Sequence, residues 1–321
     1  MSLALVALLV YTVGVKCRGI NKKEEYAPEH MFSLSENTIY KMLRFNMWDL
    51  IKHTKTHLVR TYPRGTRVSS TNYEPHRFWA AGAQLVAINW QTSGMFLFPC
   101  RLLHDLGLIS FVFLDLGYMI NHAMFQRNGR SGYVLKPTAI RHAQKDLLAK
   151  RTMHTFSVTI ISAQQLPRPR DALGREMADK AIIDPYVEVT LYIPDWPIKP
   201  ETKQKSRSKS RDRGRPAGPP PMPSTPSTSV NGTTSIPGHA LSARTSVVKK
   251  NGFNPVWEEK LIIPFECVGD MMDLIFVRFV VRQEDKDAEE PLAVYCASLG
   301  SLQHGAFSSA FWSFIFLECL P

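Results

Sequence analysis

The sequence has 321 residues, of which 44% are hydrophobic and 21% are charged. This composition excludes a fully disordered chain, and the length leaves room for two domains of ordinary size. The formal net charge of +11 suggests an anionic partner, such as nucleic acid, an acidic ligand or a lipid surface, and composition alone does not choose among them.

Cysteines and apolar stretches exclude further classes. The five cysteines are odd in number and widely spaced, without a CxxC pair, so neither a disulfide scaffold nor a zinc knuckle is supported. Apolar stretches at 2–15, 94–114 and 305–317 are too short, or too interrupted by charge, for a spanning helix of roughly 18 to 20 residues. No Lys or Arg precedes the first stretch, which disfavours a signal peptide and makes the cytoplasm the expected compartment.

Residues 1–150 mix strand and helix signals. Leu5–Tyr11, His57–Tyr62 and Gln84–Trp90 read as strands. The pattern Ser33-Leu-Ser-Glu36 is a capping box that would open a helix with an apolar face, made of Ile39, Leu43, Met47 and Leu50. Strands that alternate with helices predict a parallel α/β sheet.

Residues 154–321 have the period of strands. The predicted strands are Thr155–Ile161, Val187–Ile193, Lys260–Phe265 and Leu274–Val281, and Asn251-Gly252 marks a turn between two of them. Phe156, Val158 and Ile160 share one side of the first strand. We therefore expect an all-β sandwich.

A basic and proline-rich segment interrupts the sandwich. Residues 199–215 contain eight Lys or Arg and two Asp or Glu, and residues 216–237 add seven prolines. Such a composition cannot bury enough apolar surface to fold, so we predict a disordered insert over 198–243. Its Ser/Arg tract could contact RNA or anionic lipid, or remain a solvated loop open to phosphorylation.

Several longer stretches resemble a known family. Tyr62–Pro75, Gly82–Thr92 and Asn128–Pro137 resemble the Y-box of eukaryotic phosphoinositide-specific phospholipase C, and the likeness covers about residues 8–142. Ile183–Tyr186 and Asn251–Trp257 resemble the C2-type domain that follows the Y-box in those enzymes.

The resemblance implies an α/β half of a TIM-type barrel over 1–142, a linker over 143–153 and an all-β C2-type sandwich with its disordered insert over 154–321. In the family an X half precedes the Y half and holds two catalytic histidines and the acidic ligands of catalytic calcium. We find no trace of it in this sequence. We therefore expect a fragment that has no catalytic residues of its own and is inactive alone.

The resemblance also assigns three residues to the substrate head group. Ser33, Arg60 and Tyr62 match the residues that contact the 4- and 5-phosphates of the inositol ring in the family. Arg60 and Tyr62 lie two apart on a predicted strand and so point to one face, and Ser33 would lie at a helix N-terminus, which favours anions. Without the resemblance, Ser33 reads as a helix N-cap, Arg60 as a surface charge and Tyr62 as an edge of the core.

Calcium binding by the C2-type domain is evenly balanced. Asp184 fits the first loop, and Glu284, Asp285 and Asp287 fit the last, so Asp184 and Asp285 are the candidate ligands. Against this, Lys250 stands where an oxygen ligand is common, and Gln283 replaces an expected aspartate. A lysine repels calcium, so the sequence leaves both outcomes open.

Residues 94–114 depart from the family pattern. That pattern runs directly from Gln91-Thr92-Ser93 into the segment that begins at Asp115, whereas 21 residues intervene here. Long connections without secondary structure are uncommon inside a domain. We hypothesise that the insert is a translated, unspliced intron, and its structural alternative is a genuine lipid-facing loop.

The resemblance implies a phosphoinositide phospholipase C that hydrolyses phosphatidylinositol 4,5-bisphosphate to diacylglycerol and inositol trisphosphate in signalling. Its expected partners are phosphoinositides, an anionic membrane surface and the missing X half, on the cytoplasmic side as a peripheral protein, without nucleic acid. The rival interpretation is a non-catalytic module that binds anionic lipid through the C2-type domain and the basic loop. A third is an Arg/Ser-rich nucleic-acid binder.

Overall fold

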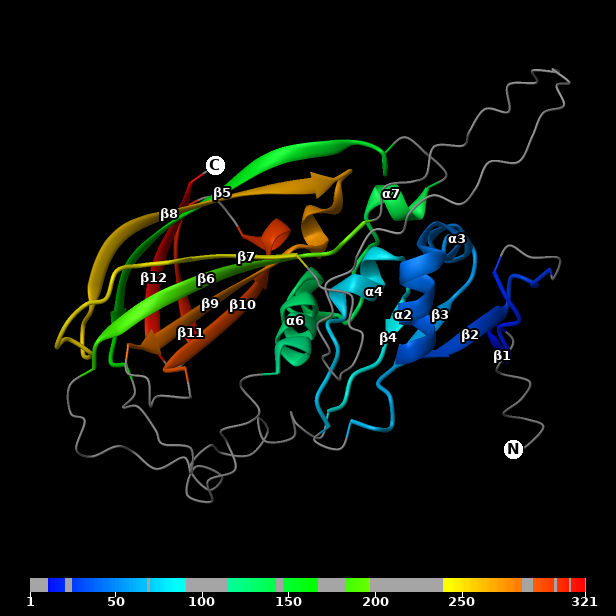
Figure 1. Ribbon diagram of the computed structural model, residues 1–321, viewed down its shortest axis with the longest axis horizontal. Coiled ribbons are helices and arrows are strands. Elements are labelled where there is room, and N and C mark those ends of the chain that lie inside the picture. Colours follow the sequence, from blue (N-terminus) through cyan, green and yellow to red (C-terminus); the bar gives the residue numbers. More distant parts are fainter. Residues whose placement is uncertain are drawn as a thin grey trace, which may run out of the picture.

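The computed structural model describes residues 11–20, 25–67, 70–90, 115–142, 147–166, 183–196, 239–284, 291–302, 305–311 and 313–320. An α/β part formed by the first half of the chain lies beside a β-sandwich formed by the second half (Figure 1). The two parts carry separate sheets, as the change in sequence period near residue 150 predicts.

The α/β part is built on a parallel sheet with the order β1-β2-β3-β4. Its strands are β1 (Val13–Val15), β2 (His30–Ser35), β3 (Val59–Tyr62) and β4 (Leu85–Val86). Its helices are α2 (Glu36–Phe45), α3 (Met47–His53), α4 (His76–Ala80), α6 (Leu116–Phe125), η2 (Asn128–Arg130) and α7 (Thr138–Arg141). The prediction of a parallel sheet with helices is confirmed.

Alternation along β2 and β3 gives the sheet two different faces. Phe32, Leu34 and Val59 are buried, while the intervening Ser33 is exposed and Arg60 is partly exposed. The predicted apolar helix face is also confirmed, because its four residues are all buried, although the helix breaks at Asn46 into α2 and α3.

One local prediction for this part is wrong, and another falls mostly on residues that the structure does not describe. Ser33 does not cap a helix, because it lies inside β2 and the helix begins at Glu36, with Ser35 as its N-cap. The predicted strand over 5–11 lies outside the described residues except for Tyr11, which is 85% exposed and not in a strand. The S-x-x-E pattern is only four residues long, so the pairing of 30–35 with both neighbouring strands overrides it.

The sandwich consists of two antiparallel sheets with the orders β10-β9-β6-β7 and β11-β12-β5-β8. Its elements are β5 (Arg151–Gln164), β6 (Pro185–Ile193), β7 (His239–Arg244), β8 (Val256–Val268), η3 (Met271–Leu274), β9 (Phe276–Gln283), β10 (Ala293–Ser298), η4 (Leu299–Ser301), β11 (Gly305–Phe311) and β12 (Ser313–Leu320). Phe156, Val158 and Ile160 are buried, as their alternation predicts. The prediction of an all-β sandwich is confirmed.

The predicted disordered insert ends too late. Residues 239–243 belong to β7, which pairs antiparallel with β6 through Val189 and Ala243 among other register partners. The strand was not predicted because its six residues are too few to show a clear alternation next to the long polar tract. The rest of the predicted insert, 198–238, lies outside the described residues.

The two parts contact each other through specific bonds. The Asp270 carboxylate of the sandwich accepts the backbone N–H groups of Thr138 and Ala139 at 2.7 and 3.1 Å. Arg127 forms an ion pair with Asp273 at 2.9 Å between Nη2 and Oδ2. These bonds fix the sandwich against the elements that follow the parallel sheet.

Candidate functional site

The three predicted head-group residues lie together on the open face of the parallel sheet. Ser33 of β2 and Arg60 of β3 are register partners, and Arg60 Nη1 donates a hydrogen bond to Ser33 Oγ at 2.9 Å. The Arg60 guanidinium carbon lies 5.1 Å from the centre of the Tyr62 ring. The sheet therefore brings all three side chains to one place.

This cluster has the chemistry of an anion site. Arg60 and Tyr62 are partly exposed and Ser33 is exposed, so a ligand can reach them from solvent. The guanidinium can donate two parallel hydrogen bonds to a phosphate, and the hydroxyl groups of serine and tyrosine can donate one each. Tyr62 is the last residue of its strand, and parallel sheets commonly bind ligands at the carboxyl ends of their strands.

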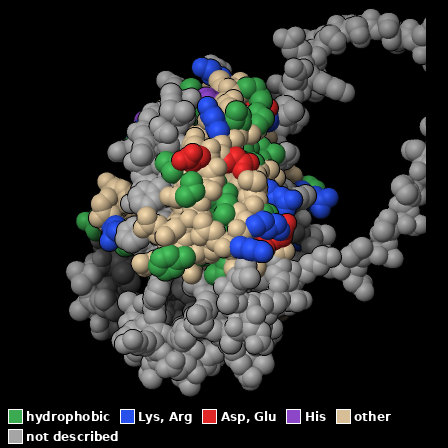
Figure 2. All heavy atoms as spheres, turned by 90° about the vertical axis from the view of Figure 1, so that its left-hand side faces the viewer, with side chains coloured by type: hydrophobic (Ala, Val, Ile, Leu, Met, Phe, Trp, Pro, Cys, Tyr) green, Lys and Arg blue, Asp and Glu red, His purple; other side chains and the backbone are tan. Residues whose placement is uncertain are grey.

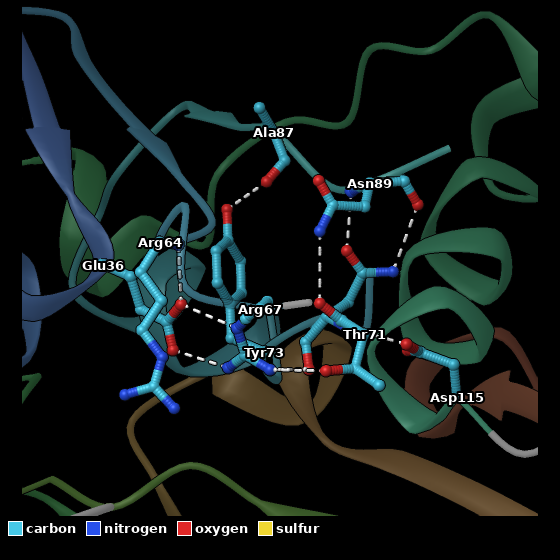
Figure 3. Close-up of polar contacts among 9 residues, drawn as sticks. Glu36, Arg64, Arg67, Thr71, Tyr73, Ala87, Asn89 and Asp115 are labelled. Carbon is cyan, nitrogen blue, oxygen red and sulfur yellow. Dashed lines mark hydrogen bonds and ion pairs between the residues drawn. The ribbon is translucent and has the colours of Figure 1, made fainter. Parts of the chain in front are cut away.

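A buried ion pair fixes the loops that leave these strands (Figure 3). Glu36 opens α2 directly after β2, and its carboxylate accepts bonds from Arg67 Nε at 2.8 Å and Arg67 Nη2 at 2.5 Å. The same carboxylate accepts the backbone N–H of Arg64 at 3.0 Å. The turn that follows Tyr62 is thereby tied to the start of α2.

The protonation of this pair follows from its partners. Burial by itself would raise the pKa of Glu36, but the hydrogen bonds from Arg67 and from the Arg64 N–H outweigh it and hold the pKa below its ordinary value. The Glu36 side chain is only 4% exposed and that of Arg67 16%. The carboxylate thus stays charged at neutral pH, with its partner beside it.

A second set of hydrogen bonds joins three loops around Asn72. The Asn72 side chain accepts the backbone N–H of Asn89 at 2.6 Å and donates to the Asn89 carbonyl at 3.2 Å. The Asn72 N–H donates to Asp115 at 2.7 Å, and Asp115 also caps α6 by accepting the Tyr118 N–H at 2.8 Å. Figure 3 shows the bonds of Asn72 to Asn89 and Asp115 beside Tyr73, which donates to the Ala87 carbonyl.

Sequence reasoning missed both sets of bonds. Glu36 was assigned to a capping box, although its partner Arg67 lies 31 residues further along the chain. The only signal available was an acid and two arginines inside stretches that resemble the Y-box, and this does not specify a pairing.

At the predicted calcium end of the sandwich, the described carboxylates lie against lysines. Asp184 Oδ1 accepts the Lys250 N–H at 2.6 Å, and its Oδ2 lies 3.8 Å from the Lys249 ammonium. The same ammonium contacts the Glu284 carboxylate. Asp285 lies outside the described residues, and the described ranges contain no group of three His, Cys, Asp or Glu side chains placed to hold a metal.

Comparison with protein families confirms the resemblance. The family described as "Phosphatidylinositol-specific phospholipase C, Y domain" matches residues 5–98, and the C2 domain family matches residues 154–217 and 220–310. None of the helices in the described segments combines the length and apolar character needed to cross a membrane.

The similar curated proteins are phosphoinositide phospholipases C. A Candida albicans 1-phosphatidylinositol 4,5-bisphosphate phosphodiesterase 1 is 30% identical over 92% of this chain, and the human eta-2 phosphodiesterase is 27% identical over 95%. The chain spans only 24% and 17% of these relatives. The crystal structure of S. officinalis PLC21 superposes with a TM-score of 0.57 at 23% identity, covering 91% of this chain and 30% of that one, which shows a common fold.

Proposed function

We propose that this chain is the head-group-binding part of a phosphoinositide phospholipase C that acts on phosphatidylinositol 4,5-bisphosphate. The observation that supports the proposal is that Arg60 donates a hydrogen bond to Ser33 and lies over Tyr62, the last residue of a parallel strand. These are the residues that the resemblance assigns to the 4- and 5-phosphates.

The site would bind the substrate through fixed charge and geometry. Because Ser33 and Arg60 are register partners, the sheet sets their separation before any ligand arrives. A bisphosphorylated ring can then take bonds from the guanidinium and both hydroxyl groups without reordering the backbone. The open face of the sheet would line the inside of a TIM-type barrel once an X half supplies the remaining strands.

The chemical step belongs to the X half in this proposal. There, by the family resemblance, two histidines would act as general acid and base. The 2-hydroxyl would attack the phosphodiester and displace diacylglycerol, leaving a cyclic phosphodiester that water would then open to inositol trisphosphate. A calcium ion held by acidic residues of that half would supply positive charge that stabilises the phosphate. The residues of this chain would hold the ring in place and contribute no proton transfer. We expect this chain alone to bind the lipid at a membrane surface without turnover.

Vesicle sedimentation tests the proposal. The chain is mixed with phosphatidylcholine vesicles that contain either phosphatidylinositol 4,5-bisphosphate or phosphatidylserine at matched charge. A charged hydrogen bond is worth about 1.5 to 3 kcal/mol, so Arg60→Ala should weaken binding to the bisphosphate vesicles roughly 10- to 100-fold. Arg44→Ala is the matched control, because it removes the same charge from an exposed position on α2.

Two other outcomes would reject this assignment. Equal binding to both vesicle types, unaffected by Arg60→Ala but lost when residues 199–215 are deleted, would favour the non-catalytic module that binds anionic lipid. Preference for RNA over both vesicles would favour a nucleic-acid binder.

A further inference from the structure

Lys249 occupies an unusual place at the loop end of the C2 domain. Its ammonium lies between the carboxylates of Asp184 and Glu284, 3.8 Å from Asp184 Oδ2 and in direct contact with Glu284 Oε2. The hydrogen bond with Glu284 raises the pKa of Lys249 above its ordinary value. A positive charge is therefore held between two negative ones that come from separate loops.

The backbone on both sides of Lys249 is fixed. The N–H of Val248 donates to the Pro185 carbonyl at 3.0 Å, and the N–H of Lys250 donates to Asp184 Oδ1 at 2.6 Å. Lys250 has a φ of 56°, and its described bond to Asp184 is through the backbone. It is Lys249, rather than the Lys250 singled out from the sequence, whose charge contacts the acids.

The described residues at this end do not fit calcium. Calcium takes six to eight oxygen ligands, mostly from carboxylates and carbonyls. Here one oxygen of Asp184 accepts an N–H and the other faces an ammonium, and the Glu284 carboxylate contacts the same ammonium. A calcium ion would have to displace the lysine and also overcome the repulsion of its charge.

We infer that Lys249 supplies the positive charge that calcium supplies in calcium-binding C2 domains, so that this end of the domain is complete without the metal. Figure 2 faces this end of the sandwich and shows Lys and Arg side chains gathered beside Asp and Glu side chains. The charge balance between the loops is then built into the sequence and does not follow the calcium concentration. The inference rests on the C2 domain alone and is independent of the head-group site.

The test is a calcium titration of the full chain, with the melting temperature Tm as the readout and excess EGTA as the reference. We expect no calcium-dependent shift in the unaltered chain. Lys249→Gln leaves the two carboxylates unbalanced, so its Tm in EGTA should fall by roughly 1–3 °C, as expected for a solvent-exposed pair in a chain of this size. Added calcium should restore part of that loss.

Two control variants make the result specific to the Lys249 charge. Lys249→Arg keeps a cation between the acids and should show neither the loss nor the calcium response. Lys250→Gln removes a neighbouring lysine charge but keeps the backbone bond, and should behave like the unaltered chain. A saturable calcium stabilisation of the unaltered chain would overturn the inference, as would a Lys249→Gln variant that cannot be distinguished from Lys250→Gln.

Discussion

Removal of residues 94–114 should leave the fold intact and make it more stable. The reason lies in Asn72, which bonds to Asn89 on one side of this segment and to Asp115 on the other. The ring centres of Trp90 and Tyr118 are also only 5.9 Å apart. The described residues that flank the segment, up to Trp90 on one side and from Asp115 on the other, are therefore held close together by contacts among themselves.

The expected gain in the free energy of unfolding follows from the length of the connection between Trp90 and Asp115. Deletion leaves residues 91–93 between Trp90 and Asp115, and four Cα–Cα steps reach about 14 Å, enough to join two loops that share contacts with one residue. Loop-closure entropy scales as 1.5 RT ln n, so shortening the connection from 24 residues to three should stabilise the fold by about 2 kcal/mol. Deleting only 94–104 should give about 0.5 kcal/mol by the same relation.

Urea unfolding of the three chains, followed by tryptophan fluorescence, measures this series. The free energies of unfolding should rise in the order unaltered chain, partial deletion, full deletion. Asn72→Ala in the fully deleted chain should remove about 1 to 3 kcal/mol, because it takes away both side-chain bonds to Asn89 while keeping the backbone bond to Asp115. A full deletion that is unfolded or less stable than the unaltered chain would refute the reasoning and assign the segment a structural role.

Three further predictions concern buried groups. Glu36→Gln should lower the free energy of unfolding by about 3 kcal/mol or more, because it breaks a buried ion pair, whereas Glu266→Gln, in an ion pair whose side chains are about 40% exposed, should cost under about 1 kcal/mol in the same denaturant assay. Burial lowers the pKa of His76 to about 3, with a smaller contribution from a neighbouring arginine. As the pH falls, the imidazole is therefore protonated in the unfolded chain before it is protonated in the folded one. The contribution of neutral His76 to the free energy of unfolding is therefore present above pH 6.5 and is lost as the pH falls towards 3. His76→Gln should shrink the difference in unfolding free energy between pH 7 and pH 5 by about 2 kcal/mol. An unchanged difference would contradict the lowered pKa of His76. Gly117→Ala should destabilise the chain although alanine favours helices, because the added Cβ would lie 2.1 Å from the Tyr73 carbonyl oxygen; a raised Tm would count against the packing.

Long periodic patterns made most of the fold predictable. The alternation of Phe156, Val158 and Ile160 predicted a buried strand face, and the spacing of Ile39 and Leu43 predicted a helix face, because burial repeats with the period of the element. The position of Arg60 beside Tyr62 followed from strand geometry in the same way.

Bonds between distant residues were not predictable from a single sequence. The S-x-x-E pattern at Ser33 predicted a helix cap, but Glu36 instead pairs with Arg67, which lies beyond the next strand. Because the pair is buried, its hydrogen bonds are stronger than those of an exposed cap, and they determine where the Glu36 side chain lies. Likewise, nothing in the run Lys249-Lys250 says which lysine reaches an acid, because the backbone turn at the second residue decides it.

The ion pair and the head-group cluster are two consequences of one arrangement of strands. Ser33 and Arg60 lie opposite each other because β2 and β3 pair in parallel, and the same pairing brings Glu36, after β2, close to the loop that follows β3. A shift of register by one residue would turn Arg60 into the core and separate Glu36 from Arg67. The buried pair therefore opposes the shift that would destroy the site, and we expect the arrangement of Ser33 and Arg60 to be fixed before any phosphate binds.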